Sequence, residues 1–223
     1  MKMKSRLMAV VGLLMIAVLL ATSQVSAITN VVAPEFEDHD ITGAVVEFST
    51  EQTALGTHSV KMHIPQGEIG EVYNLGLNAE VRLATGMSRS RGLILYDGVS
   101  FKAKPGEGGV NGPLYVSIIL YDRTSRVWVS ILNYAPVWSG PDPSGWYTLT
   151  VPVGGSWDGW TFGGAHYGPG YVSLTAWDQW IASQGFDVDV RKVNIQFGYG
   201  WYAWGTVYVD VLSFAGRTLD FEP

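Results

Sequence analysis

The side chains of this chain best suited to binding chemistry are its tryptophans, and all nine lie between Trp128 and Trp204. An indole offers a flat apolar face and one N–H donor, so it either packs in a core or stacks on a flat ligand. A single small core rarely needs so many indoles from one stretch of chain. We therefore expect some of them to face solvent as a binding surface.

Alternation along four predicted strands sorts polar and aromatic side chains onto one face. These strands are 98–104, 113–121, 126–134 and 192–198, and alternate residues in each are mainly apolar. The side chains opposite the apolar ones include Lys102, Tyr115, Ser117, Trp128, Ser130, Asn194 and Gln196. Such a mixture suits a sugar, whose CH faces stack on rings while its hydroxyls bond to amides and hydroxyls. If the four strands share a sheet, this face is predicted to bind carbohydrate; the alternative is that a loop covers it.

More tryptophans fall in three segments rich in glycine and proline, 135–145, 154–170 and 199–205. They are Trp138, Trp157, Trp160, Trp201 and Trp204. Exposed loop backbone offers little depth for burying an indole, so we expect an aromatic rim at one mouth of the fold. The alternative is that Trp157 and Trp160 fold back over the core.

Signatures of catalysis are missing from the sequence. The four histidines are scattered, with no H-E-x-x-H pattern. The segment 154–158, GGSWD, has Asp158 where a nucleophile elbow requires glycine. Asp187 and Asp189 share an alternation face, but we expect them in a loop. A small polysaccharide lyase or glycoside hydrolase is the least favoured alternative, because paired catalytic carboxylates come from distant strands and leave no local pattern.

Residues 1–27 are typical of a secretory signal peptide, with a basic start, an apolar stretch over 7–21 and a cleavage tripeptide ending at Ala27. The apolar stretch is short for a transmembrane helix, although an uncleaved anchor is the alternative. Cleavage would leave residues 28–223 in an extracellular or periplasmic location. No membrane span is expected after cleavage.

Charge and cysteine content exclude further classes. The chain has 14 basic and 20 acidic residues and a net charge of −6, whereas nucleic-acid binding depends on clustered Lys and Arg. Without cysteine there is no disulfide framework and no thiolate metal site. Stability must come from one core, formed by a single domain over residues 28–223.

Short segments with period-two alternation recur between Gly, Pro, Asn and Asp turns, which predicts an all-β antiparallel sandwich. One short helix is predicted over 174–185, capped by Thr175 and ended by Gly185. Its apolar stripe, Leu174, Trp177 and Ile181, should pack on the sheet, so Trp177 is assigned to the core.

The segments resemble those of the jelly-roll carbohydrate-binding modules of secreted glycan-degrading enzymes. The likeness spans nearly all of residues 28–223. It rests on short segments at 36–38, 49–62, 96–109, 145–153, 173–180, 193–200 and 205–216. The resemblance implies two antiparallel sheets, a concave face or loop rim that holds a polysaccharide or cell-surface glycan, and a structural calcium ion.

The resemblance also implies ligands for that ion. They would be Glu37, Asp210 and backbone carbonyls near Gly56 and Thr57. Calcium takes 6–8 oxygen ligands and could tie the first and last strands together. The family usually has a second acidic residue after the strand Asp, where this chain has Val211.

A function of another class is an extracellular structural, filament-forming or surface-layer protein. The apolar segment 28–33, ITNVVA, could add a strand to the open sheet edge of a second copy. Such self-assembly is the main alternative to carbohydrate binding.

Overall fold

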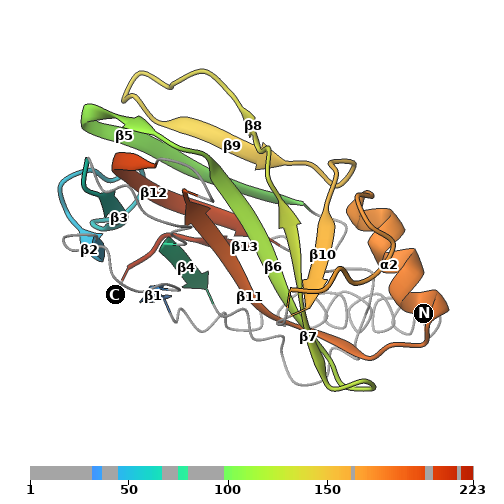
Figure 1. Cartoon of the computed structure of the whole chain (residues 1–223). Coiled ribbons are helices and arrows are strands. Elements are labelled where there is room, and N and C mark those ends of the chain that lie inside the picture. Colours follow the sequence, from blue (N-terminus) through green and yellow to red (C-terminus); the bar gives the residue numbers. More distant parts are fainter. Residues whose placement is uncertain are drawn as a thin grey trace, which may run out of the picture.

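Two antiparallel sheets form a β-sandwich, with one short helix in the part of the chain that the structure describes, which confirms the predicted all-β fold (Figure 1). The computed structural model describes residues 32–36, 45–66, 75–79, 98–161, 164–198, 203–214 and 217–222. The predicted signal peptide, residues 1–27, lies outside these ranges.

The first sheet, here sheet A, has the strand order β1-β4-β11-β6-β7-β10, with antiparallel neighbours throughout. Its strands are β1 (Val32–Phe36), β4 (Leu75–Ala79), β11 (Val188–Phe197), β6 (Leu114–Asp122), β7 (Val127–Asn133) and β10 (Asp158–Thr161). Asp189 belongs to β11, so its prediction as a loop residue is wrong. In β1, Val32 pairs with Ala79 and Ala33 with Asn78. This part of the segment predicted to join a second copy therefore completes the chain's own sheet.

The second sheet, sheet B, has the order β2-β3-β12-β5-β9-β8, and β13 pairs with β12. Its strands are β2 (Val45–Ser49), β3 (Ser59–Ile64), β12 (Trp204–Phe214), β5 (Val99–Asn111), β9 (Tyr147–Val151), β8 (Val137–Trp138) and β13 (Arg217–Leu219). The four strands predicted to share a sheet are therefore divided, because β5 lies in sheet B and the other three in sheet A.

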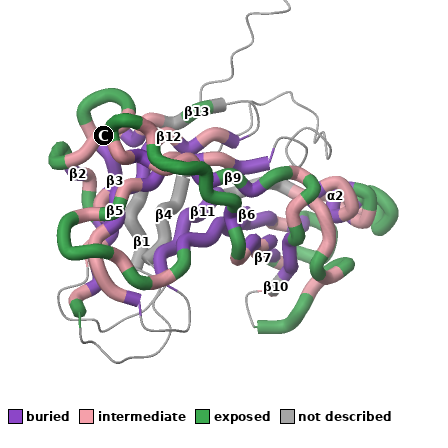
Figure 2. Tube along the Cα trace, turned by 90° about the horizontal axis from the view of Figure 1, so that it is seen from above, coloured by how far each residue is buried: buried purple, intermediate pink, exposed green. Residues whose placement is uncertain are grey.

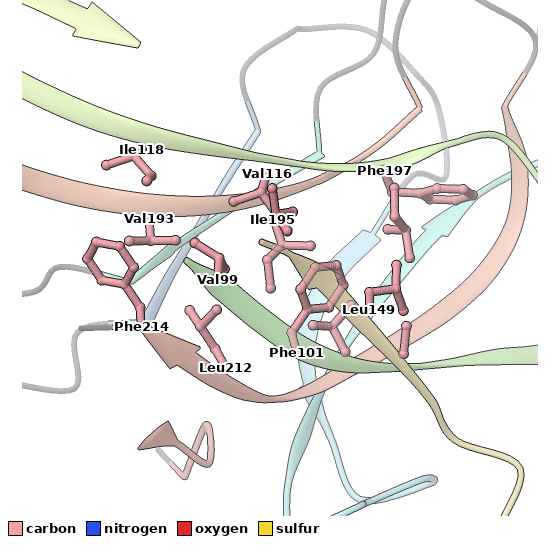
Figure 3. Close-up of a cluster of buried hydrophobic side chains, with 14 of the residues drawn as sticks. Val99, Phe101, Val116, Ile118, Leu149, Val193, Ile195, Phe197, Leu212 and Phe214 are labelled. Carbon is pink, nitrogen blue, oxygen red and sulfur yellow. The ribbon is translucent and has the colours of Figure 1, made fainter. Parts of the chain in front are cut away.

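The core lies between the inner faces of the two sheets (Figure 2). Alternate residues of β6 and β11 point inward and meet alternate residues of β5, β9 and β12 (Figure 3). The side chains drawn together there include Val116, Ile118, Val193, Ile195, Phe197, Phe101, Leu149 and Phe214. Burying one such side chain stabilises the fold by about 1.5–3 kcal/mol. This apolar layer therefore stabilises a sandwich that has no disulfide.

Helix α2 (Leu174–Ser183) packs its apolar stripe into this core, as predicted. Its N-cap is Ser173, whose Oγ accepts a hydrogen bond from the Ala176 N–H at 3.1 Å. The predicted cap, Thr175, is wrong because that residue already lies inside the helix. Trp177 is 1% exposed and donates its Nε1–H to the carbonyl oxygen of Trp157 at 3.1 Å.

Among the residues that the structure describes, no helix combines the length and the apolar character needed to cross a membrane.

Glycine is required where β10 passes the Trp177 ring. A Cβ atom built on Gly159 would lie 2.2 Å from Cη2 of Trp177 and 2.4 Å from the carbonyl oxygen of Tyr167. The Trp177 ring has no room to move away, because it is buried among core residues. The close approach of β10 to α2 therefore depends on the absence of a side chain at residue 159.

Replacing Gly159→Ala should destabilise the protein by about 1–3 kcal/mol through overpacking. In a chain of this length the melting temperature should fall by roughly 2–4 °C for each kcal/mol. The matched control is Gly154→Ala, because nothing lies within 4 Å of its added Cβ. Thermal unfolding followed by circular dichroism should separate the two variants; equal melting temperatures would contradict this packing.

Candidate functional site

An aromatic pair lies on the outer face of sheet A. Tyr121 of β6 and Trp128 of β7 lie opposite each other in the antiparallel register. Their ring centroids are 4.9 Å apart and their planes are inclined by 48°. Trp128 is 37% exposed, whereas its neighbour Val129 points inward and is 2% exposed. Strand alternation therefore presents both rings on the side of the sheet away from the core.

Polar side chains continue along the same outer face. Ser117 of β6 lies opposite Asn194 of β11, and Tyr115 lies opposite Gln196. These four side chains are only 1–5% exposed. The predicted face therefore exists on three strands, but its polar end is buried in this structure.

Ile119 and Ser130 join the two ends of this face, because they are opposite each other in the β6–β7 register. Outward side chains on one strand are two residues apart, which is about 7 Å. We call this surface the sheet A strip. It consists of Tyr115, Ser117, Ile119 and Tyr121 of β6, with their register partners Gln196 and Asn194 of β11 and Ser130 and Trp128 of β7.

The tryptophans predicted to form a loop rim do not gather in one place. Trp157 is fully buried in the core, so the alternative in which it folds back is the one observed. Trp138 belongs to β8 of sheet B and is 48% exposed. Trp204 begins β12 and is half-buried, and Trp201 lies outside the described residues. Trp160 belongs to β10 and pairs in register with Ser130.

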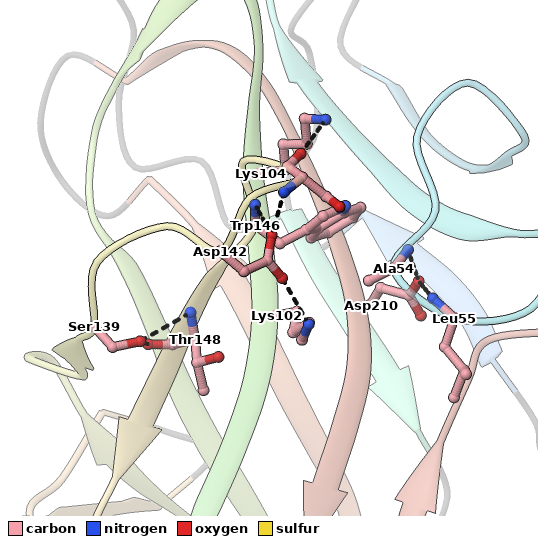
Figure 4. A network of polar contacts seen from close by, with 10 residues as sticks. Ala54, Leu55, Lys102, Lys104, Ser139, Asp142, Trp146, Thr148 and Asp210 are labelled. Carbon is pink, nitrogen blue, oxygen red and sulfur yellow. Dashed lines mark hydrogen bonds and ion pairs between the residues drawn. The ribbon is translucent and has the colours of Figure 1, made fainter.

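Lys102 has a structural partner on the outer face of sheet B. Its Nζ donates to Oδ2 of Asp142 at 2.9 Å, and Lys104 Nζ donates to the carbonyl oxygen of Ser144 at 2.8 Å (Figure 4). Oδ1 of Asp142 accepts the N–H groups of Ser144 and Trp146. The hydrogen bond from Lys102 lowers the pKa of Asp142. Lys102 therefore holds the turn before β9 and lies away from the sheet A strip.

Asp210, a predicted calcium ligand, is fully buried in β12. Its Oδ2 accepts the N–H groups of Ala54 at 2.7 Å and Leu55 at 3.0 Å (Figure 4). Its Oδ1 accepts the N–H of Val211 at 2.7 Å. Burial raises the pKa of Asp210, and these backbone hydrogen bonds act in the opposite direction. The turn before β3 therefore presents N–H donors, rather than carbonyl oxygens, to this carboxylate.

Glu222 binds the same turn from the last residues of the chain. Its carboxylate accepts the N–H groups of Thr57 and His58 and the hydroxyl of Thr57, the last at 2.7 Å. Gly56 makes room for it, because a Cβ there would lie 2.0 Å from Oε1 of Glu222. These bonds, chiefly that from the Thr57 hydroxyl, lower the pKa of Glu222 to about 2. The sequence gives no signal for this contact, since the partners lie 164 and 165 residues apart.

Both carboxylate oxygens of Asp210 and the hydroxyl of Thr57 are hydrogen-bonded within the protein, so a calcium ion would have to replace some of these bonds. No group of three or more His, Asp or Glu side chains that could hold a metal is present in the described ranges. Glu37 lies outside them. The calcium site therefore stays a prediction from the resemblance.

Comparison with known proteins finds no family model and no curated protein that matches the chain. The site is therefore interpreted from its geometry and chemistry.

The hydrogen bonds of Glu222 to residues 57 and 58 predict a pH-dependent difference in stability between the protein and its Glu222→Gln variant. Folding lowers the pKa of this carboxyl from its ordinary value of 4.5 to about 2, so its ionised form stabilises the folded state above pH 4.5. That stabilisation should disappear as the pH falls through 4.5 towards 2. The melting temperatures of the two proteins should therefore differ most near neutral pH and converge in acid. A difference that stays constant with pH would contradict this role of the Glu222 carboxylate.

Proposed function

We propose that this protein is a secreted, non-catalytic β-sandwich that binds a polysaccharide or cell-surface glycan on the sheet A strip. The observation that carries the proposal is the Tyr121–Trp128 pair at 4.9 Å, in which Trp128 is exposed, on the same face as hydroxyl and amide side chains. Aromatic faces bind the CH faces of sugars, and nearby polar groups orient the hydroxyls.

The expected affinity is modest. Each aromatic contact contributes about 0.5–1.5 kcal/mol beyond area burial, so two rings give a weak and reversible attachment. Ser130, two residues beyond Trp128 on β7, adds a hydroxyl on the same side.

Calcium is a separate part of the proposal, resting on the resemblance. If Glu37, Asp210 and the backbone near Thr57 bind it, adding calcium to chelator-treated protein should raise the melting temperature, because a ligand of the folded state stabilises that state. Magnesium at the same concentration is the control, since it prefers smaller octahedral sites. No upward shift with calcium would contradict the site.

Trp128→Ala should weaken glycan binding by about tenfold, because it removes the larger ring of the pair. Affinity electrophoresis on a panel of soluble glycans measures this loss. The control is Trp138→Ala, which removes an exposed indole from sheet B. If the parent protein moves unretarded through every glycan, or only Trp138→Ala loses retardation, binding on this strip is wrong.

A further inference from the structure

Two buried polar atoms on paired residues of the sheet A strip have no hydrogen-bond partner in the described structure. They are Oγ of Ser117 and Oδ1 of Asn194, which the described structure leaves unpaired. Their residues are 1% and 3% exposed and lie directly opposite each other in the β6–β11 register. Among the unpaired buried side-chain atoms of the described chain, only these two occupy paired positions on neighbouring strands.

Such a pair is unusual for a structural role. Leaving a buried acceptor unbonded costs folding free energy, so buried polar groups normally have partners. Asn133 on the neighbouring strand β7 shows the ordinary arrangement. Its Nδ2 donates to the carbonyl oxygen of Ser156 at 2.9 Å, and its Oδ1 accepts the N–H of Ala135 at 3.0 Å.

We propose that Ser117 and Asn194 determine the specificity of the proposed glycan site by binding two neighbouring hydroxyl groups of one sugar ring. The inference rests on the proposed function and names its recognition chemistry. Opposite residues on neighbouring strands have Cβ atoms about 5 Å apart, so both side chains reach adjacent substituents of one ring. The amide oxygen accepts one hydroxyl proton, and the serine hydroxyl can donate or accept.

The neighbouring strip residues fit this assignment. Ile119 separates the pair from the Tyr121–Trp128 rings and offers an apolar contact, while Tyr115 and Gln196 follow on the other side. Exposure increases towards Trp128, which makes that end the side from which a ligand reaches Ser117 and Asn194. A hydrogen bond formed there is shielded from water and is correspondingly stronger.

The test compares Ser117→Ala and Asn194→Leu with the parent protein on a glycan that the parent binds. Because neither atom has a partner in the described structure, both variants should keep or raise the melting temperature. Each should weaken binding at least tenfold in isothermal titration calorimetry. Ser100→Ala is the matched control, a half-buried serine on the outer face of sheet B. Unchanged binding by both folded variants would overturn the proposal and assign the two atoms to a trapped water.

A second measurement uses the unaltered protein and so does not depend on the variants folding. Monodeoxy forms of the bound sugar are tested as inhibitors. Loss of either of two adjacent hydroxyls should weaken inhibition at least tenfold, and loss of the others should not. Equal inhibition by every deoxy sugar would overturn the proposal while leaving glycan binding itself intact. A parent protein that binds no glycan would instead overturn the proposed function, and this inference with it.

Discussion

Burial of the two apolar sheet faces against each other is the interaction on which the rest of the structure depends. With no cysteine in the chain, this layer and the hydrogen bonds around it supply the stability. Because of period-two alternation, the same strands form the core and present side chains on the outer face. Each inward Val, Ile or Leu directs its neighbours in the strand outward. Inward Val116 and Ile118 thus direct Ser117 onto the outer face. The sheet A strip is a geometric consequence of the core.

Carboxylates hold the loops where a disulfide or a metal would often be used. Asp210 binds the N–H groups of residues 54 and 55, Glu222 binds those of residues 57 and 58, and Asp142 holds the turn before β9. Each carboxylate collects several donors from one turn, which is how a single side chain orders a short loop. Asp210 and Glu222 therefore fix the turn before β3 from distant parts of the chain, whereas Asp142 orders its own turn.

The sequence predicted the local features of the fold and missed those that depend on contacts between residues far apart in the sequence. Alternation assigned the faces of β6, β7 and β11, and the helical stripe placed Trp177 in the core. Alternation does not say which strands share a sheet, so Lys102 was grouped with Asn194 although β5 lies in the other sheet. The glycine-rich segment around Trp157 likewise led to a wrong prediction that this residue is exposed, because the surrounding turns bring Trp157 back to the core. Glu222 carries no local pattern because its partners lie 165 and 164 residues away in the sequence.

The central claim is that Trp128, among nine tryptophans, is the indole that contacts a glycan. Its most direct test is to follow the indole N–H resonances by NMR while a glycan that the protein binds is added. Trp128, assigned with a Trp128→Phe variant, should shift with ligand, and the buried indoles of Trp146 and Trp177 should not. Movement of the Trp138 resonance with that of Trp128 unchanged would contradict the account.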